Sequence, residues 1–130
     1  MNPIDPNLQT GTIGELLVQI RLLQYDVQSV ATHKDTGNDL LATKGEIFRA
    51  IQVKTTRTRG RQITFKYRQL MTKKFHILVL VRLSGENRRV DLDESDLYLL
   101  RRDEVTKSCY QRDELERFRL GPERIDELFQ

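Results

Sequence analysis

Apolar and polar positions follow two different periods along this chain, which predicts a mixed α/β domain. A helix is expected from residue 11 to 24, with Thr12 as its N-cap. Its apolar stripe consists of Ile13, Leu16, Leu17, Ile20 and Leu23. Residues 1–9 contain Pro3 and Pro6 and are expected to form an irregular entry.

Short apolar runs bounded by turn residues predict strands at 27–31, 39–43, 46–55 and 96–100. A helix is the alternative for the last of them. The unbroken apolar run 75–81 predicts a central strand buried on both faces. A short helix at 67–74 and a terminal helix after Pro122 complete the expected elements. Turns or loops are expected at 35–38, 44–45, 56–63 and 84–87.

The expected order is therefore one helix, three strands, a helix, two strands and a final helix. At 130 residues the chain has the size of a single domain, residues 1–130. No stretch is long enough to span a membrane, the first residues lack the features of a signal peptide, and Cys109 has no cysteine to pair with. We expect a cytoplasmic protein.

Positive charge is concentrated in one part of the sequence. The net charge is only +3, yet no Asp or Glu occurs between Ile47 and Gly85. Ten basic residues fall in that interval: Arg49, Lys54, Arg57, Arg59, Arg61, Lys66, Arg68, Lys73, Lys74 and Arg82. Such a block favours a polyanionic partner, and nucleic acid in particular, over a merely solvated surface. The last forty-five residues alternate acids and bases, which suggests a solvated or subunit-facing surface.

Three polar residues near the predicted second hairpin are the main chemical candidates. Gln52 and Lys54 are two positions apart on a strand and project to one face, while Ile51 and Val53 turn to the other. If the strands pair, Asp39 meets Gln52 and Lys54. Asp39, the Gln52 amide and the Val53 carbonyl offer oxygen ligands for a divalent metal. Lys54 is placed to orient or deprotonate an attacking water.

Glu15 is a fourth candidate with two interpretations of about equal weight. Thr12 and Glu15 have the spacing of a capping box, which is a purely structural role. Glu15 also shares a helical stripe with Val18 and Leu22, so its side of the helix is expected to be partly covered. Gly14 beside it permits a close approach to a strand or ligand. In that setting the carboxylate completes a metal shell.

Together, Gly14-Glu15, Asn38-Asp39-Leu40 and Gln52-Val53-Lys54 resemble the motifs of the PD-(D/E)xK nuclease superfamily. The resemblance covers roughly residues 10–56 and extends to the expected order of elements. It implies a restriction-endonuclease-like mixed sheet flanked by helices (an αβββαβ core) and Mg²⁺-dependent hydrolysis of DNA, with Mn²⁺ as a possible substitute. The site it implies consists of Glu15, Asp39, Gln52 and Lys54.

One position departs from the superfamily pattern. Asp or Glu is usual where this chain has Gln52, and the change removes one negative charge from the metal site. The Gln-x-Lys variant resembles that of small homing endonucleases and of archaeal-type Holliday junction resolvases. Asp35 and Glu46 are second-rank replacements for the missing carboxylate.

Three functions follow as hypotheses. The first is a metal-dependent DNA endonuclease, working as a homodimer or homotetramer because one small domain offers one cleavage centre. The second is a non-catalytic DNA-binding module on the same fold, and the third is an interaction protein with an acidic partner. In the first two, the DNA contacts are assigned to Arg57, Arg59, Arg61, Lys66, Arg68, Lys73 and Lys74.

Overall fold

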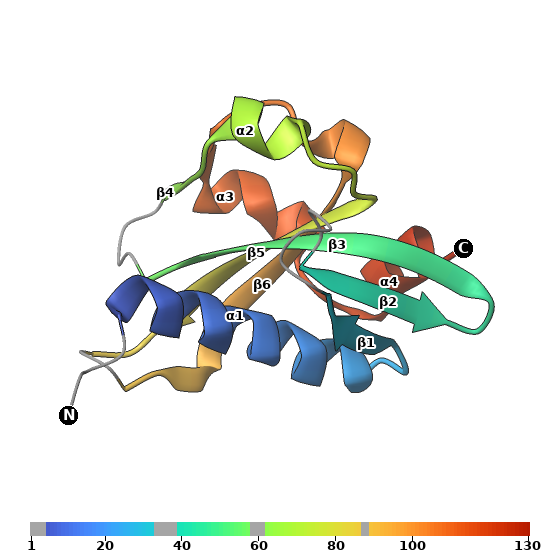
Figure 1. Cartoon of the computed structure of the whole chain (residues 1–130), viewed down its shortest axis with the longest axis horizontal. Helices are drawn as coiled ribbons and strands as arrows, with labels where there is room; N and C mark the ends of the chain where they lie inside the picture. Colours follow the sequence, from blue (N-terminus) through green and yellow to red (C-terminus); the bar gives the residue numbers. More distant parts are fainter. Residues whose placement is uncertain (1–4, 33–38, 58–61, 87–88) are drawn as a thin grey trace.

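A five-stranded mixed sheet forms the centre of the protein, with helices on both faces (Figure 1). The computed structural model describes residues 5–32, 39–57, 62–86 and 89–130. The sheet strands are β1 (Gln28–Ala31), β2 (Leu40–Lys44), β3 (Ile47–Thr56), β5 (Ile77–Ser84) and β6 (Asp91–Arg101). They lie in the order β1-β2-β3-β5-β6, and every neighbouring pair is antiparallel except β3 and β5.

The parallel pairing of β3 with β5 requires a long crossover between them. That crossover carries β4 (Gln62–Thr64) and α2 (Tyr67–Met71). It also contains most of the basic block. Because β4 pairs with β7 (Cys109–Gln111), the crossover is tied to the C-terminal part of the chain in a small second sheet.

Alternate residues of the central strands pack into two separate cores, one on each face of the sheet, because successive side chains of a strand point to opposite faces. One face, including Val79, Val81 and Leu99, packs against α1 (Pro6–Leu23) and α4 (Pro122–Leu128). The other face, including Leu78 and Leu80, is covered by α2, β4, β7 and the helical turns α3 (Arg112–Leu115) and η3 (Glu116–Phe118). A further turn, η2 (Arg102–Glu104), follows β6 directly. The strand β5 is thus buried on both sides, as the apolar run predicts.

The start of the first helix differs from the sequence prediction. The helix begins at Pro6, and Asp5 is the N-cap, accepting hydrogen bonds from the backbone N–H groups of Asn7 and Leu8 at 2.7 and 3.3 Å. The irregular entry predicted for residues 1–9 is therefore wrong at residues 6–9, and the cap assigned to Thr12 is wrong as well. Pro6 is tolerated because the N–H of the first helical residue has no acceptor within the helix, so a proline without an N–H loses no hydrogen bond there. With Thr12 inside the helix, the capping-box role of Glu15 is also excluded.

The apolar stripe of this helix is only partly buried. Leu17 faces the sheet, but Leu16, Ile20 and Leu23 are each more than half exposed. The fully buried positions are instead Val18 and Leu22, together with Gly14. The helix therefore has one apolar face toward the core and a second toward solvent.

The C-terminal part contributes more to the core than its alternating charges indicate. The strand β6 is eleven residues long, and the residues that follow it supply Leu115, Phe118, Ile125 and Leu128 to the two cores. The loop predicted over 56–63 is wrong at Thr56, the last residue of β3, and at Gln62 and Ile63, which belong to β4. The turn predicted at 35–38 lies outside the described residues. None of the helices in the described part of the chain has the length and apolarity needed to span a membrane.

Candidate active site

The candidate site is built where α1, the start of β2 and the middle of β3 meet. β2 and β3 pair as the predicted hairpin, with Leu40 opposite Ile51. Asp39 precedes β2 and is held by hydrogen bonds of both its backbone and its side chain. Its backbone N–H donates to the carbonyl of Ile51 at 3.1 Å, and its Oδ2 accepts from the N–H of Val53 at 2.8 Å. The Asp39 carboxylate is thereby held against the Gln52–Lys54 segment.

Gln52 and Lys54 share the sheet face that α2 covers, as their spacing predicts. In the parallel register they lie beside Leu78 and Leu80 of β5. Gln52 is fully buried, whereas Lys54 is partly exposed. Ile51 and Val53 are buried toward the α1 side. The strand therefore presents an amide and an ammonium group side by side in an otherwise apolar environment.

Glu15 reaches the site because α1 lies very close to β3. A Cβ atom at Gly14 would lie only 1.9 Å from Oγ1 of Thr55 and 2.8 Å from its Cβ. Glycine is therefore required for this approach. Burial raises the pKa of the Glu15 carboxyl, and the charge of Asp39 raises it further. The second effect means that the two carboxylates are close enough to repel one another.

Lys54 is electrostatically coupled to residues from two other elements. Burial lowers the pKa of its ammonium group, and Lys73 lowers it further, while Asp39 acts in the opposite direction. Lys73 follows α2 in the crossover, so folding brings part of the basic block to Lys54. The sequence assigned Lys73 to DNA contact alone, and its proximity to Lys54 depends on a crossover path that the sequence does not reveal.

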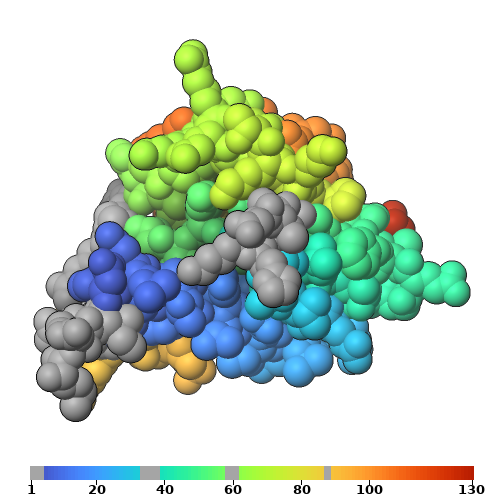
Figure 2. Space-filling model, in the orientation of Figure 1, coloured from blue at the N-terminus to red at the C-terminus, as the bar shows by residue number. Residues whose placement is uncertain are grey.

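The other predicted DNA-binding residues occupy the same crossover. Arg57 follows β3 directly, Lys66 is the N-cap of α2, and Arg68 lies within it. Lys66, Arg68 and Lys74 are exposed. In Figure 2, the yellow-green surface of this segment stands above the blue surface of α1. Arg59 and Arg61 lie outside the described residues, as does the second-rank candidate Asp35.

The donor set fits a hard divalent cation such as Mg²⁺ or Mn²⁺. The described residues contain no cluster of three or more His, Cys, Asp or Glu side chains suited to one metal ion. The carboxylate pair of Glu15 and Asp39 is nevertheless held together against its own repulsion, which a cation would relieve. The Gln52 amide adds an oxygen donor of the type such cations accept. Glu46 comes just before β3, at the end of the hairpin remote from Asp39.

Comparison with known proteins gives one structural similarity. The sequence matches no model of a protein family and no curated protein. Among solved structures, the chain is similar to the one described as "The structure of a bacterial homing endonuclease: I-Ssp6803I". The TM-score is 0.57 at 14% sequence identity, over 94% of this chain and 88% of the other. The protein thus has a homing-endonuclease-like fold, a five-stranded mixed sheet flanked by helices.

Proposed function

We propose that this protein is a metal-dependent DNA endonuclease that hydrolyses phosphodiester bonds, of the PD-(D/E)xK type with a Gln-x-Lys variant site. The observation that carries the proposal concerns Glu15, Asp39, Gln52 and Lys54: the Asp39 carboxylate accepts from the Val53 N–H, between Gln52 and Lys54, and its charge acts on both Glu15 and Lys54. They come from α1, the residue before β2, and β3. The close contact of Gly14 with Thr55 brings α1, and with it Glu15, near β3. The fold shared with a homing endonuclease supports the same conclusion.

Asp39, Glu15, Gln52 and the Val53 carbonyl are the groups that would hold a divalent cation. The cation would polarise the phosphate and neutralise charge that develops on it during hydrolysis. Asp39 is oriented for this role by the Val53 N–H, which fixes one carboxylate oxygen at 2.8 Å. Gln52 contributes an oxygen without a charge, so the site carries one negative charge fewer than a three-carboxylate site.

Lys54 is the residue to which we assign the proton of the attacking water. Its pKa is lowered by burial and by Lys73, which raises the fraction of neutral amine available as a base. In its charged form the same nitrogen donates hydrogen bonds to phosphate oxygens and stabilises their added charge. Lys73 and the exposed basic residues of the crossover hold the DNA backbone on this face of the sheet.

We further propose that two copies associate through the exposed face of α1. Each chain has one cleavage centre, so a monomer would have to dissociate from the DNA and bind again to cut the second strand. Leu8, Leu16, Ile20 and Leu23 are each more than half exposed, and Leu92 lies beside this face in a groove shared with Leu16 and Ile20. With roughly 100 Å² offered by each such side chain, two copies bury about 1,000 Å², the minimum for a specific interface. A group of exposed apolar side chains of this kind marks an interaction surface.

The direct test is cleavage of supercoiled plasmid, branched and single-stranded DNA with Mg²⁺, with Mn²⁺ and with EDTA. Asp39→Ala and Lys54→Ala are expected to lose cleavage by at least 10²-fold while retaining DNA binding. Lys44→Ala, at the far end of the β2–β3 hairpin, is the matched control and should cut normally. Metal-independent binding with no cleavage of any substrate would instead support the non-catalytic DNA-binding module.

A further inference from the structure

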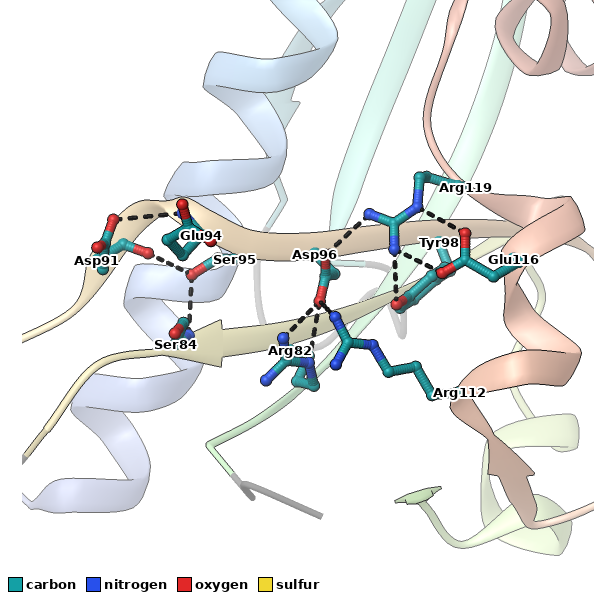
Figure 3. A network of polar contacts seen from close by, with 10 residues as sticks. All are labelled: Arg82, Ser84, Asp91, Glu94, Ser95, Asp96, Tyr98, Arg112, Glu116 and Arg119. Carbon is teal, nitrogen blue, oxygen red and sulfur yellow. Dashed lines mark hydrogen bonds and ion pairs between the residues drawn. The ribbon is translucent and has the colours of Figure 1, made fainter. Parts of the chain in front are cut away.

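Asp96 of β6 gathers three arginine side chains from three separate parts of the chain (Figure 3). Its Oδ2 accepts from Nε and Nη2 of Arg82 at 3.0 and 2.6 Å and from Nη2 of Arg112 at 3.3 Å. Its Oδ1 accepts from Nη1 of Arg119 at 2.8 Å. Arg82 lies on β5, Arg112 begins α3, and Arg119 follows η3.

Positive charge is in excess in this cluster. The charge of Arg119 is neutralised by Glu116, which accepts two hydrogen bonds from it at 3.0 and 2.7 Å. Asp96 is then shared between Arg82 and Arg112. Both donate to the same oxygen, so their guanidinium nitrogens are no more than about 6 Å apart, a distance at which like charges repel appreciably. A second anion between them would relieve that repulsion.

Arg112 is the member able to receive that anion. The side chains of Asp96 and Arg82 are 10% and 14% exposed, whereas that of Arg112 is 46% exposed. A guanidinium carries five N–H donors in a planar fork. Arg112 contacts Asp96 at 3.3 Å and also interacts with the Tyr98 hydroxyl, and the exposed part of its fork is left to donate toward solvent.

The cluster lies on the same face of the sheet as Gln52 and Lys54. Lys54 pairs with Leu80, and Thr56 pairs with Arg82, two residues further along both strands. Side chains two apart share a face, so Lys54 and Arg82 project to the same side. With strands about 4.8 Å apart and a rise of about 3.3 Å per residue, the Cα atoms of Lys54 and Arg82 are about 8 Å apart.

We propose that Arg82 and Arg112, oriented by Asp96, form a binding site for a backbone phosphate of the DNA next to the one that is cleaved. The assignment rests on the proposed nuclease function and extends the DNA contacts to α3, far from the basic block in sequence. Paired non-bridging phosphate oxygens match the planar forks of two arginines. The phosphate replaces solvent at Arg112 while Asp96 keeps Arg82 in place.

The test measures binding of a fluorescent 30-base-pair duplex by anisotropy, in EDTA, over a series of KCl concentrations. Arg112→Gln is expected to weaken binding several-fold at low salt. It should also reduce the slope of log affinity against log salt by about 0.9, the value for one lost phosphate contact. Its unfolding midpoint in urea should match that of the wild type, because Arg82 and Arg119 still neutralise Asp96.

Arg101→Gln is the matched control. Arg101 is exposed on β6, the strand that carries Asp96, but it is five residues from Asp96 and therefore on the opposite face of the sheet. It should bind like the wild type. A wild-type affinity and slope for Arg112→Gln, or an equal loss for Arg101→Gln, overturns the proposed site while leaving the nuclease function intact. A site for free phosphate would show phosphate-dependent stabilisation of the wild type with an unchanged DNA slope in Arg112→Gln, which also overturns it. A wild-type protein that binds no DNA overturns both proposals.

Discussion

The contact between α1 and β3 can be tested by placing one methyl group at two glycines of the same helix. Gly14→Ala would bring a Cβ to within 2.8 Å of three Thr55 atoms, one of them a strand-anchored Cβ that cannot rotate away. Gly11→Ala would meet nothing within 4 Å. The same chemical change is thus made three residues apart, once against a strand and once in open space.

The expected effects have opposite signs. Replacing glycine by alanine inside a helix stabilises it by about 1 kcal/mol, which is the whole effect expected for Gly11→Ala. At Gly14, overpacking costs about 2–3 kcal/mol, so the net result is a loss of about 1–2 kcal/mol. The two variants should differ by about 2–3 kcal/mol. For a chain of this size, that difference corresponds to roughly 8–12 °C in the melting temperature.

Urea unfolding followed by circular dichroism measures both free energies, and equal m-values confirm that the comparison is valid. Thr55→Ala removes Oγ1 and Cγ2, two of the three clashing atoms, and should recover part of the loss in a Gly14→Ala background. If Gly14→Ala stabilises the protein as Gly11→Ala does, α1 does not lie against β3. The placement of Glu15 at the site would then be refuted as well.

Three further predictions concern the site, the arginine cluster and the α1 face. Glu15→Gln should retain DNA binding but need more Mg²⁺ for half-maximal cleavage; an unchanged metal requirement would remove Glu15 from the site. Asp96→Asn should lose about 3 kcal/mol in urea unfolding at pH 7, because it leaves partly buried arginines uncompensated. Ile20→Glu should convert a dimer to a monomer in light scattering, whereas Phe48→Glu, an exposed apolar position on β3, should not; a wild-type monomer, or capture of another partner by this face, would contradict the pairing.

The Asp96 prediction also carries a pH dependence with a definite sign. Burial alone would raise the pKa of Asp96, but hydrogen bonds from Arg119 and Arg82 outweigh it and hold the pKa below the ordinary value of 3.8. Asp96 therefore stabilises the fold fully above that value, and this contribution is lost as the pH falls through the lowered pKa. The difference in stability between the wild type and Asp96→Asn should shrink below pH 4. A difference that stays constant down to pH 2 would contradict this assignment.

The sequence predicts the core of the sheet well because its signal is local. The period of two at Gln52 and Lys54 and the apolar run of β5 depend only on residues adjacent in the chain. Both faces of β3 are as expected for that reason. The terminal helix after Pro122 is also confirmed, since proline at a first helical position is a local preference.

Features that depend on pairing between distant segments escape such analysis. β4 is three residues long and is stabilised by β7, almost fifty residues away, so no local pattern marks it. Asp96 looks like an ordinary charged residue at the start of the predicted strand 96–100 until Arg112 and Arg119 are folded against it. In α1, the helical stripe marks apolar positions but does not distinguish the face toward the sheet from the face toward solvent. Gly14 marks the buried side only once its contact with Thr55 is seen.

The position of the basic crossover explains why the proposed DNA contacts lie on the same face of the sheet as Lys54. A parallel pair of strands needs a connection that passes over one face of the sheet, and here that connection runs over the face that bears Lys54. Lys73 lowers the pKa of Lys54 from this connection, so charges suited to holding DNA also favour the neutral amine needed for proton transfer. Lys73→Glu would reverse both effects at once, weakening DNA binding and raising the pKa of Lys54. Lys73→Gln would remove the repulsion without adding a negative charge. A cleavage pH profile that moves upward in both variants, and further in Lys73→Glu, would show that this coupling operates during catalysis; identical profiles in both variants and the wild type would restrict Lys73 to DNA binding.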